Sequence, residues 1–129
     1  MQKQSFQRFP IRYRPYDFPA RFPVLAFLGE NWTISMDSPE YLHFHNGLEI
    51  GHCIRGNGQV FMTGRSPSVY DTGAFSILFP QVPHMAVCGT QESQWEYIYI
   101  DPIRFPESAT DCGSDIWQIF YMLQEIPVI

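Results

Sequence analysis

The chain has 129 residues, enough for one domain that buries its own core without cross-links. Its net charge of -5, with Lys3 as the single lysine, argues against a direct nucleic-acid surface, because neutralising phosphates takes clustered Lys and Arg. Eleven Phe, seven Tyr and three Trp are typical of a barrel whose interior is filled with rings.

The cysteines and the hydropathy pattern indicate the compartment. Cys53, Cys88 and Cys112 are odd in number and irregularly spaced, which favours free thiols in a reducing environment over a disulfide framework. No apolar run reaches membrane-spanning length, and the N-terminus lacks the apolar core of a signal peptide. The sequence therefore predicts a cytoplasmic protein without a membrane segment.

Residues 1–23 differ from the rest of the chain in composition. They hold four prolines with Phe, Tyr and Arg between them, and proline at this density excludes helix and central strand. We expect an extended arm with at most one short edge strand. The simplest interpretation of this arm is a partly ordered terminus whose arginines are solvated.

Short strand patterns separated by turn signals follow as far as Ile100. Residues 74–79 form a continuous apolar run, which we expect to be buried on both faces of a sheet. Asn57-Gly58 suits the positive φ angles of a two-residue hairpin turn. Many short strands with turns every eight to twelve residues predict an antiparallel sandwich or barrel over residues 24–112. The expected strands are 24–28, 32–36, one through His43 and His45, 49–55, 59–63, 74–79, one starting at His84, and 95–100.

A helix is predicted only at the end of the chain, over residues 113–129. Ser114 suits the N-cap position, and the residues after it are apolar at helical spacing with little polar face. Such a helix needs a partner: the barrel wall, a second copy of the chain, or sequence outside these residues. The apolar positions are Ile116, Trp117, Ile119, Phe120, Tyr121, Leu123 and Ile126.

The stretch from His43 to Gly56 carries the residues best suited to chemistry. His43 and His45 lie two apart, so both imidazoles project from one face of a strand. After the turn signal Asn46-Gly47 the chain can return and bring the Glu49 carboxylate toward them, and His84 is a fourth candidate downstream. Three imidazoles and a carboxylate can hold zinc, nickel, manganese or iron, or can bind a small ligand inside an apolar cavity.

Five further side chains are weaker ligand-binding candidates. The rings of Trp32, Trp95, Tyr97 and Tyr99 can stack on a sugar or an aromatic ligand, and Arg55 can pair with a ligand carboxylate. For each ring taken singly, ordinary core packing is the simpler interpretation.

The spacing of these residues resembles a known family. His43, His45, Glu49 and Gly56 match the spacing of the first cupin motif, and residues 73–84, G-A-F-S-I-L-F-P-Q-V-P-H, are similar to the second. The segments E-I-G-H-C-I-R-G-N-G and W-E-Y-I-Y-I-D resemble the sensor domain of AraC-type transcription regulators more than they resemble cupin enzymes. The second motif departs from the cupin pattern, because Ala74 stands where aspartate is common and Val82 where glycine is common.

The resemblance implies an all-β, cupin-like antiparallel β-barrel (jelly roll) with an extended N-terminal arm and a C-terminal α-helix. It also implies a non-enzymatic, homodimeric sensor whose effector, a sugar or a small organic acid, binds in the barrel. The arm would then pack its aromatics at the barrel mouth, covering the ligand or contacting the DNA-binding domain. The helix-turn-helix units of such regulators have no counterpart in these 129 residues, so we expect the sensor half of a longer protein.

Two alternatives remain open from the sequence. The same four residues, His43, His45, Glu49 and His84, can hold the metal of a small cupin enzyme such as a dioxygenase or an isomerase. A lectin-like carbohydrate binder without a regulatory partner is the third interpretation.

Overall fold

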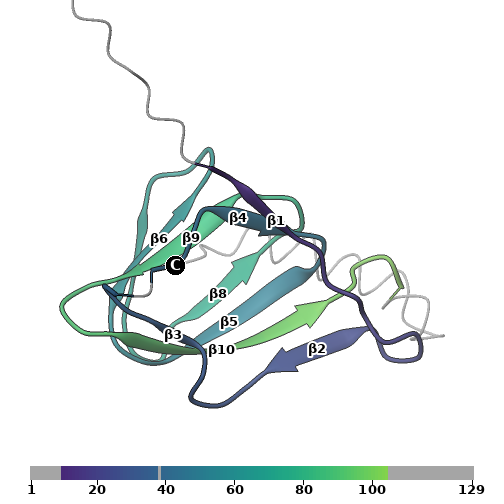
Figure 1. Cartoon of the computed structure of the whole chain (residues 1–129), viewed down its shortest axis with the longest axis horizontal. Helices are drawn as coiled ribbons and strands as arrows, with labels where there is room; N and C mark the ends of the chain where they lie inside the picture. Colours follow the sequence, from purple (N-terminus) through teal and green to yellow (C-terminus); the bar gives the residue numbers. More distant parts are fainter. Residues whose placement is uncertain (1–9, 38, 105–129) are drawn as a thin grey trace, which may run out of the picture.

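The protein is seen here in a computed structural model, which describes residues 10–37 and 39–104. Its chain folds into two β-sheets that face each other (Figure 1). The predicted helix over residues 113–129 lies outside the described residues, as do residues 1–9 of the arm. The strands are Arg12–Arg14 (β1), Val24–Phe27 (β2), Thr33–Ile34 (β3), His43–His45 (β4), Leu48–Arg55 (β5), Gly58–Met62 (β6), Ser68–Tyr70 (β7), Phe75–Leu78 (β8), His84–Cys88 (β9) and Ser93–Ile100 (β10).

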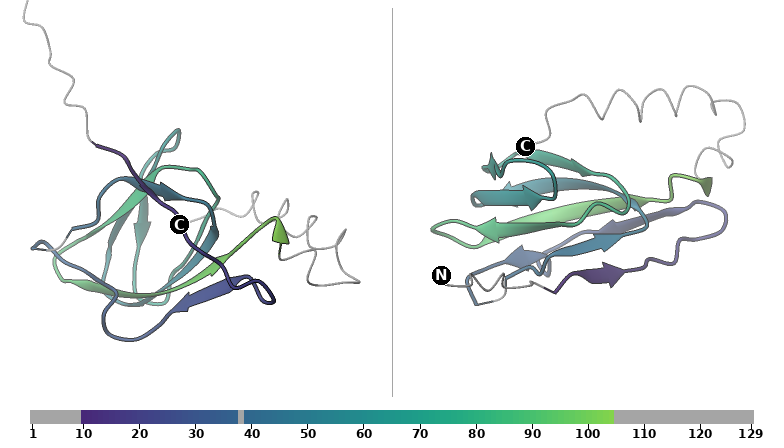
Figure 2. Two further views of the ribbon diagram at one scale, coloured as in Figure 1. Left: turned by 45° about the vertical axis from the view of Figure 1, so that its right-hand side comes forward. Right: turned by 90° about the horizontal axis from the view of Figure 1, so that it is seen from above.

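The two sheets wrap around a common interior (Figure 2). One has the order β1-β4-β9-β6-β7, the other β2-β10-β5-β8, and β3 also pairs with β10. Among the described strands, every pairing is antiparallel except that of β1 with β4, which is parallel. The prediction of an antiparallel barrel is confirmed. No described segment forms a helix long and apolar enough to cross a bilayer.

The chain changes sheets at both of its Asn-Gly signals. β4 and β6 belong to one sheet and β5 to the other, so Asn46-Gly47 and Asn57-Gly58 are corners between sheets. The hairpin predicted at Asn57-Gly58 is therefore wrong, and the positive φ angle lies one position earlier, at Gly56 (102°). The corner at Gly56 is tight, because a Cβ there would stand 2.6 Å from the Cα of Ser93. Glycine meets both demands of this corner.

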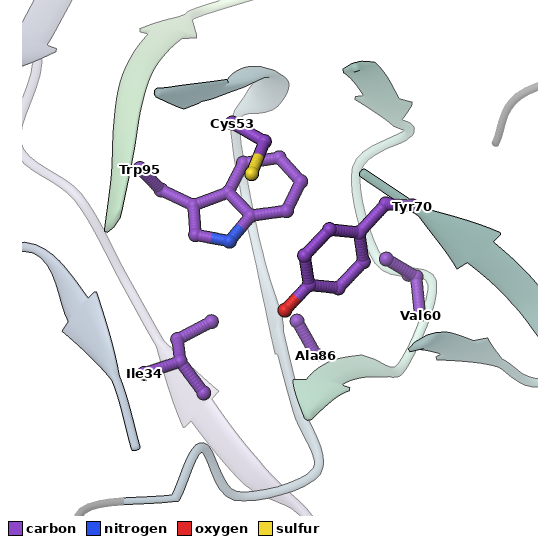
Figure 3. Packing of buried hydrophobic residues seen from close by; sticks show 6 residues of the cluster. All are labelled: Ile34, Cys53, Val60, Tyr70, Ala86 and Trp95. Atoms are coloured by element: carbon purple, nitrogen blue, oxygen red, sulfur yellow. The ribbon is translucent and has the colours of Figure 1, made fainter. Parts of the chain in front are cut away.

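The interior is apolar at one end, where Trp95 packs edge-on against Tyr70 at a centroid distance of 4.9 Å. The apolar cluster at this end consists of Ile34, Cys53, Val60, Tyr70, Ala86 and Trp95, and Figure 3 shows it between the two sheets.

Strand β8 alternates, with Ser76 and Leu78 buried and Phe75 61% exposed. The expectation that residues 74–79 are buried on both faces is therefore wrong, because one face of this sheet is open to solvent.

The described part of the arm, residues 10–23, packs against the barrel. β1 lies beside β4, and the ring of Tyr13 stacks on Phe44 at 4.9 Å. Beyond β1, the Asn46 side chain continues the contact: its Oδ1 accepts from the Tyr16 backbone N–H at 2.8 Å, and its Nδ2 donates to the Tyr16 carbonyl at 3.0 Å. These contacts place the arm beside the strand that carries His43 and His45, at the edge of the same sheet.

Candidate functional site

Four buried polar side chains meet inside the barrel, and we call them the His/Glu cluster: His43, His45, Glu49 and His84. One ligand atom from each lies within 4.8 Å of all the others, and none of the four residues is more than 4% exposed. β4 and β9 pair at a single position, His43 opposite His84, and β5 supplies Glu49 from the facing sheet. All four residues expected from the sequence are thus brought together.

The three imidazoles of the cluster are oriented in the same way. In each, Nδ1 bonds to a backbone carbonyl two residues away in sequence, which turns Nε2 toward the shared centre. Because a carbonyl can only accept, Nδ1 carries the proton, and a neutral ring then keeps its lone pair on Nε2. The contacts are His43 to Tyr41 O at 2.6 Å, His45 to Gly47 O at 2.9 Å and His84 to Val82 O at 2.8 Å.

Glu49 completes the cluster. Its Oε2 lies 2.9 Å from His45 Nε2 and 3.6 Å from His84 Nε2. Burial opposes ionisation of Glu49, but the two imidazoles outweigh burial and hold the pKa of this carboxyl well below its usual range. A charged carboxylate therefore sits beside the ring nitrogens.

The surroundings shift the pKa values of two of the histidines in opposite directions. Burial and the neighbouring His84 lower the pKa of His43 to about 4, so its imidazole is neutral at pH 7. Burial alone would lower the pKa of His84, but Glu49 outweighs it and raises this pKa. A neutral imidazole is the form that binds a metal.

The residues of the cluster fit a metal ion. In the described part of the chain, His84 Nε2 is one of two buried side-chain polar atoms without a hydrogen-bond partner, and buried polar atoms are rarely left so. The short contact between His45 and Glu49 needs a proton between its two atoms, and a cation can take the place of that proton. Three imidazole nitrogens and one carboxylate oxygen are a donor set for zinc, manganese, iron or nickel.

Glu40 is a further acidic group of the site. The sequence analysis did not single it out, because it lies outside the expected strands and outside the two cupin motifs. Its Oε2 accepts the backbone N–H of Ala86 in β9 at 2.7 Å, where β4 no longer pairs with β9. Burial, with a contribution from Glu49, raises the pKa of Glu40 to about 7. The carboxyl of Glu40 therefore titrates near neutrality.

A small cavity adjoins the His/Glu cluster. It offers about 10 Å³ of space for the centre of a water molecule, which is room for about one water. Two of the sequence candidates, Trp95 and Tyr97, line it, so the structure places both next to the cluster. Glu40, Glu49, Ser76 and His84 also line it.

Two other candidates lie away from the cluster. Arg55 is on the surface, where its guanidinium pairs with Glu92 at 2.8 Å. Trp32 is 37% exposed and stacks on Phe27 at 4.8 Å. The structure brings neither side chain to the cavity.

Two tyrosines cover the cluster from the arm side. The ring of Tyr99 meets His45 edge-on at 5.1 Å, and the ring of Tyr16 lies 5.8 Å from His45 and 4.4 Å from Tyr99. Tyr99 was a sequence candidate. Tyr16 was not, and its only signal was the expectation that arm aromatics pack at the barrel mouth.

Comparison with known proteins agrees with this architecture. The chain matches the model of the AraC-like ligand binding domain over residues 26–117. No curated protein sequence is significantly similar to it.

Solved structures of cupins are similar to the chain. A Cupin 2 conserved barrel domain protein from Salinispora arenicola CNS-205 has a TM-score of 0.51 at 13% identity, covering 85% of this chain and 97% of that one, which shows the cupin fold. A RmlC-like cupin from Methanocaldococcus jannaschii gives 0.49 at 12% identity over 53% of this chain and 63% of that one. Hydroxypropylphosphonic acid epoxidase from S. wedmorenis gives 0.45 at 20% identity over 60% of this chain and 41% of that enzyme.

Proposed function

Since the chain belongs to the family of AraC-like ligand binding domains, we propose that it is the effector-binding and dimerising domain of a cytoplasmic transcription regulator. A small molecule binds in the barrel beside the His/Glu cluster, and DNA is contacted by a helix-turn-helix domain outside these 129 residues. The match to the family over residues 26–117 is the observation that carries the proposal. The net charge of -5 is consistent with a domain that does not itself contact DNA.

The signal passes through the arm in this proposal. A ligand that binds two arrangements of the arm with different affinities shifts the balance between them. The arm lies over His45 through Tyr16, and Arg104 Nη2 donates to the Phe18 carbonyl at 2.9 Å. A displacement of the arm at the cluster would therefore also alter the contact between Phe18 and Arg104, the residue that precedes residues 105–129.

The His/Glu cluster holds one divalent metal ion in this proposal. His43, His45, Glu49 and His84 would hold such an ion, which would supply Lewis-acid chemistry toward an oxygen of the effector. The chain's own contribution is the fixed orientation of three rings by backbone carbonyls and the carboxylate of Glu49.

The function is tested with the purified 129-residue chain. We expect one member of a panel of sugars and small organic acids to raise the unfolding midpoint, because a ligand that binds only the folded state stabilises it. The His43→Ala variant should lose this shift, whereas His52→Ala should keep it, because the His52 ring stacks on Phe75 on the other face of the sheet. A shift that survives in His43→Ala would place the effector elsewhere.

A second candidate function is a small metal-dependent cupin enzyme, such as a dioxygenase or an isomerase. The observation that favours it is Glu40, a carboxyl with a pKa of about 7 in the same cavity as Glu49 and His84. A group that titrates near neutrality suits general acid or base chemistry. Turnover of a small substrate by metal-loaded protein, lost in Glu40→Gln while metal is retained, would support the enzyme over the sensor.

A further inference from the structure

A second pocket lies on the outer face of the sheet β1-β4-β9-β6-β7. Its wall residue Met85 faces outward, because side chains alternate along a strand and its neighbours in β9, His84 and Ala86, are buried inside the barrel. The pocket has a volume of about 290 Å³, close to the lower end of the range for small-molecule sites. We call it the outer pocket, and it is lined by Pro10, Pro39, Glu40, Tyr41, Leu42 and Met85.

The side chain of Glu40 lies in a gap of this sheet. β4 and β9 pair only where His43 faces His84, and a continued antiparallel ladder would set Tyr41 opposite Ala86. Instead, the Ala86 backbone N–H donates to Glu40 Oε2 at 2.7 Å. Glu40 lines the outer pocket and also the small cavity beside the His/Glu cluster, so it forms part of the wall between the two.

Glu40 is the one acidic or basic side chain that lines the outer pocket. Among the described residues, no Lys, Arg or His forms an ion pair with it, and its Oε1 has no hydrogen-bond partner. Two arginines of β1 leave this role open: Arg14 acts on Glu40 from beyond ion-pair distance, and Arg12 is exposed and lies over the Tyr41 ring at 4.1 Å. A carboxyl without a counter-ion favours a ligand cation, because a hydrogen bond between ionised groups is about twice as strong as one between neutral groups.

The remaining walls favour an apolar body on that ligand. Contact with Leu42 and Met85 removes apolar surface of both partners from water. Pro10 and Pro39 have fixed φ angles, so their walls change little when a ligand binds. The outer pocket measures about 290 Å³ where the cavity beside the cluster measures about 10 Å³, so a ligand of several atoms fits outside the barrel without displacing a side chain.

We propose that the outer pocket is a second binding site, which takes a small amine with an apolar body. The ammonium group pairs with Glu40, and the apolar body lies against Pro39, Leu42 and Met85. This site is on the outside of the barrel, so the inference goes beyond the proposed function and does not depend on it.

The test uses phenethylamine, a primary amine on a single ring, as the probe, and the full chain with ¹³C-labelled methionine methyl groups. At pH 8 the carboxyl of Glu40 is mostly ionised and the amine is protonated. The Met85 methyl resonance should shift during the titration, because Met85 lines the outer pocket. The Met62 methyl resonance should stay in place, because Met62 pairs with His84 and shares its inward face.

Two variants and a second probe test the pairing with Glu40. Glu40→Gln keeps an oxygen for the Ala86 N–H but loses the charge, so phenethylamine should bind at least about tenfold more weakly. Glu92→Gln is the matched control, since it removes a surface carboxylate that pairs with Arg55, and its affinity should equal that of wild type. Phenethyl alcohol has a similar shape without the charge, and wild type should bind it at least about tenfold more weakly than the amine.

Results of two kinds would overturn the inference. A titration in which the Met85 resonance does not shift, or in which Met62 shifts instead, would show that the amine does not bind in the outer pocket. Equal affinity of wild type and Glu40→Gln, or of amine and alcohol, would remove the requirement for a cation. If Glu40→Gln does not fold, the methyl shifts and the comparison of amine with alcohol in wild type decide the question.

The other possible occupant is residues 1–9 of the same chain, which precede Pro10 and contain Phe6 and Phe9. A chain with both Phe6→Ala and Phe9→Ala should bind phenethylamine with the affinity of wild type. Binding at least about tenfold tighter would mean that these rings compete for the outer pocket, and would assign it to residues 1–9 in place of an amine.

Discussion

The imidazoles of His43, His45 and His84 reach their orientation without help from a ligand. Each Nδ1 is bonded to a carbonyl of its own neighbourhood, two residues before or after it. The rings are therefore held by the backbone of the segments that flank β4 and β9, so binding a metal requires little reordering of side chains. Pre-orientation of this kind raises affinity, because the entropy of ordering is already lost on folding.

Metal content is predicted to depend on two residues of the cluster. Elemental analysis of the wild-type protein should give close to one divalent metal per chain, and His45→Ala and Glu49→Ala should each lower the affinity by about 10–100-fold or more. His52→Ala should keep the metal. Wild-type protein that is well folded but free of metal would contradict this prediction.

Glu40 is predicted to make stability depend on pH. Its pKa is raised to about 7 in the folded protein from an ordinary 4.5, so the folded state holds a proton that the unfolded state releases between these values. The stability that Glu40 contributes is complete below pH 4.5 and is lost as the pH rises through 7. His43, with a pKa lowered to about 4 from an ordinary 6.5, acts in the opposite direction: its contribution is complete above pH 6.5 and is lost as the pH falls toward 4.

The Glu40→Gln variant separates these two effects. It keeps an oxygen for the Ala86 N–H but cannot ionise. Between pH 5 and pH 8, its free energy of unfolding should therefore rise relative to that of wild type by up to about 3 kcal/mol. Urea unfolding at the two pH values measures the gain. An equal difference between variant and wild type at both values would show that Glu40 does not titrate in this window.

At the scale of strands, local pattern predicted the elements but not their partners. Alternating and apolar runs located eight of the described strands, whereas β7 (Ser68–Tyr70) was missed because three residues give too short a pattern. Asn46-Gly47 and Asn57-Gly58 signalled turns correctly, yet a turn signal does not say which sheet the next strand joins. That choice depends on distant strands such as β10, whose residue Ile100 pairs with Leu48 of β5, far away in the sequence.

The same difference between local pattern and tertiary packing explains which residues of the site could be predicted. His43, His45, Glu49 and His84 could be named in advance because their spacing matches the cupin motifs. Glu40 and Tyr16 could not, since one lies in the connection between β3 and β4 and the other in a proline-rich arm, and both meet the cluster only through tertiary packing. Arg55 was a candidate because its guanidinium can pair with a ligand carboxylate, but its strand places it on the surface beside Glu92.

The corner between β5 and β6 gives a prediction for stability. Gly56→Ala should cost roughly 2–4 kcal/mol, because it combines a φ of 102° with a Cβ that would stand 2.6 Å from the Cα of Ser93. Gly64→Ala is the matched control: its φ is 78°, but nothing lies within 4 Å of the added Cβ, so about 1 kcal/mol is expected. Equal losses of the two variants in urea unfolding would contradict the steric argument.

On the scale of the whole molecule, association is predicted to depend on residues 113–129. Their apolar residues at helical spacing need a partner, and a second copy of the chain is the one that the proposed function requires. Leu123→Asp should raise the monomer fraction in sedimentation experiments, whereas Gln124→Asp, at a polar position of the same segment, should not. An unchanged mass for Leu123→Asp, and for a chain lacking residues 114–129, would place the dimer contact elsewhere.

The cluster also joins the two halves of the barrel. His43, His45 and His84 stand on the sheet β1-β4-β9-β6-β7, and Glu49 stands on β2-β10-β5-β8. A ligand that bonds to all four residues is therefore a removable cross-link between the sheets, and its binding free energy adds to the free energy of unfolding of the barrel. Occupancy of the site and the working lifetime of the folded protein then rise and fall together, so a chain deprived of its ligand would be the first to be degraded.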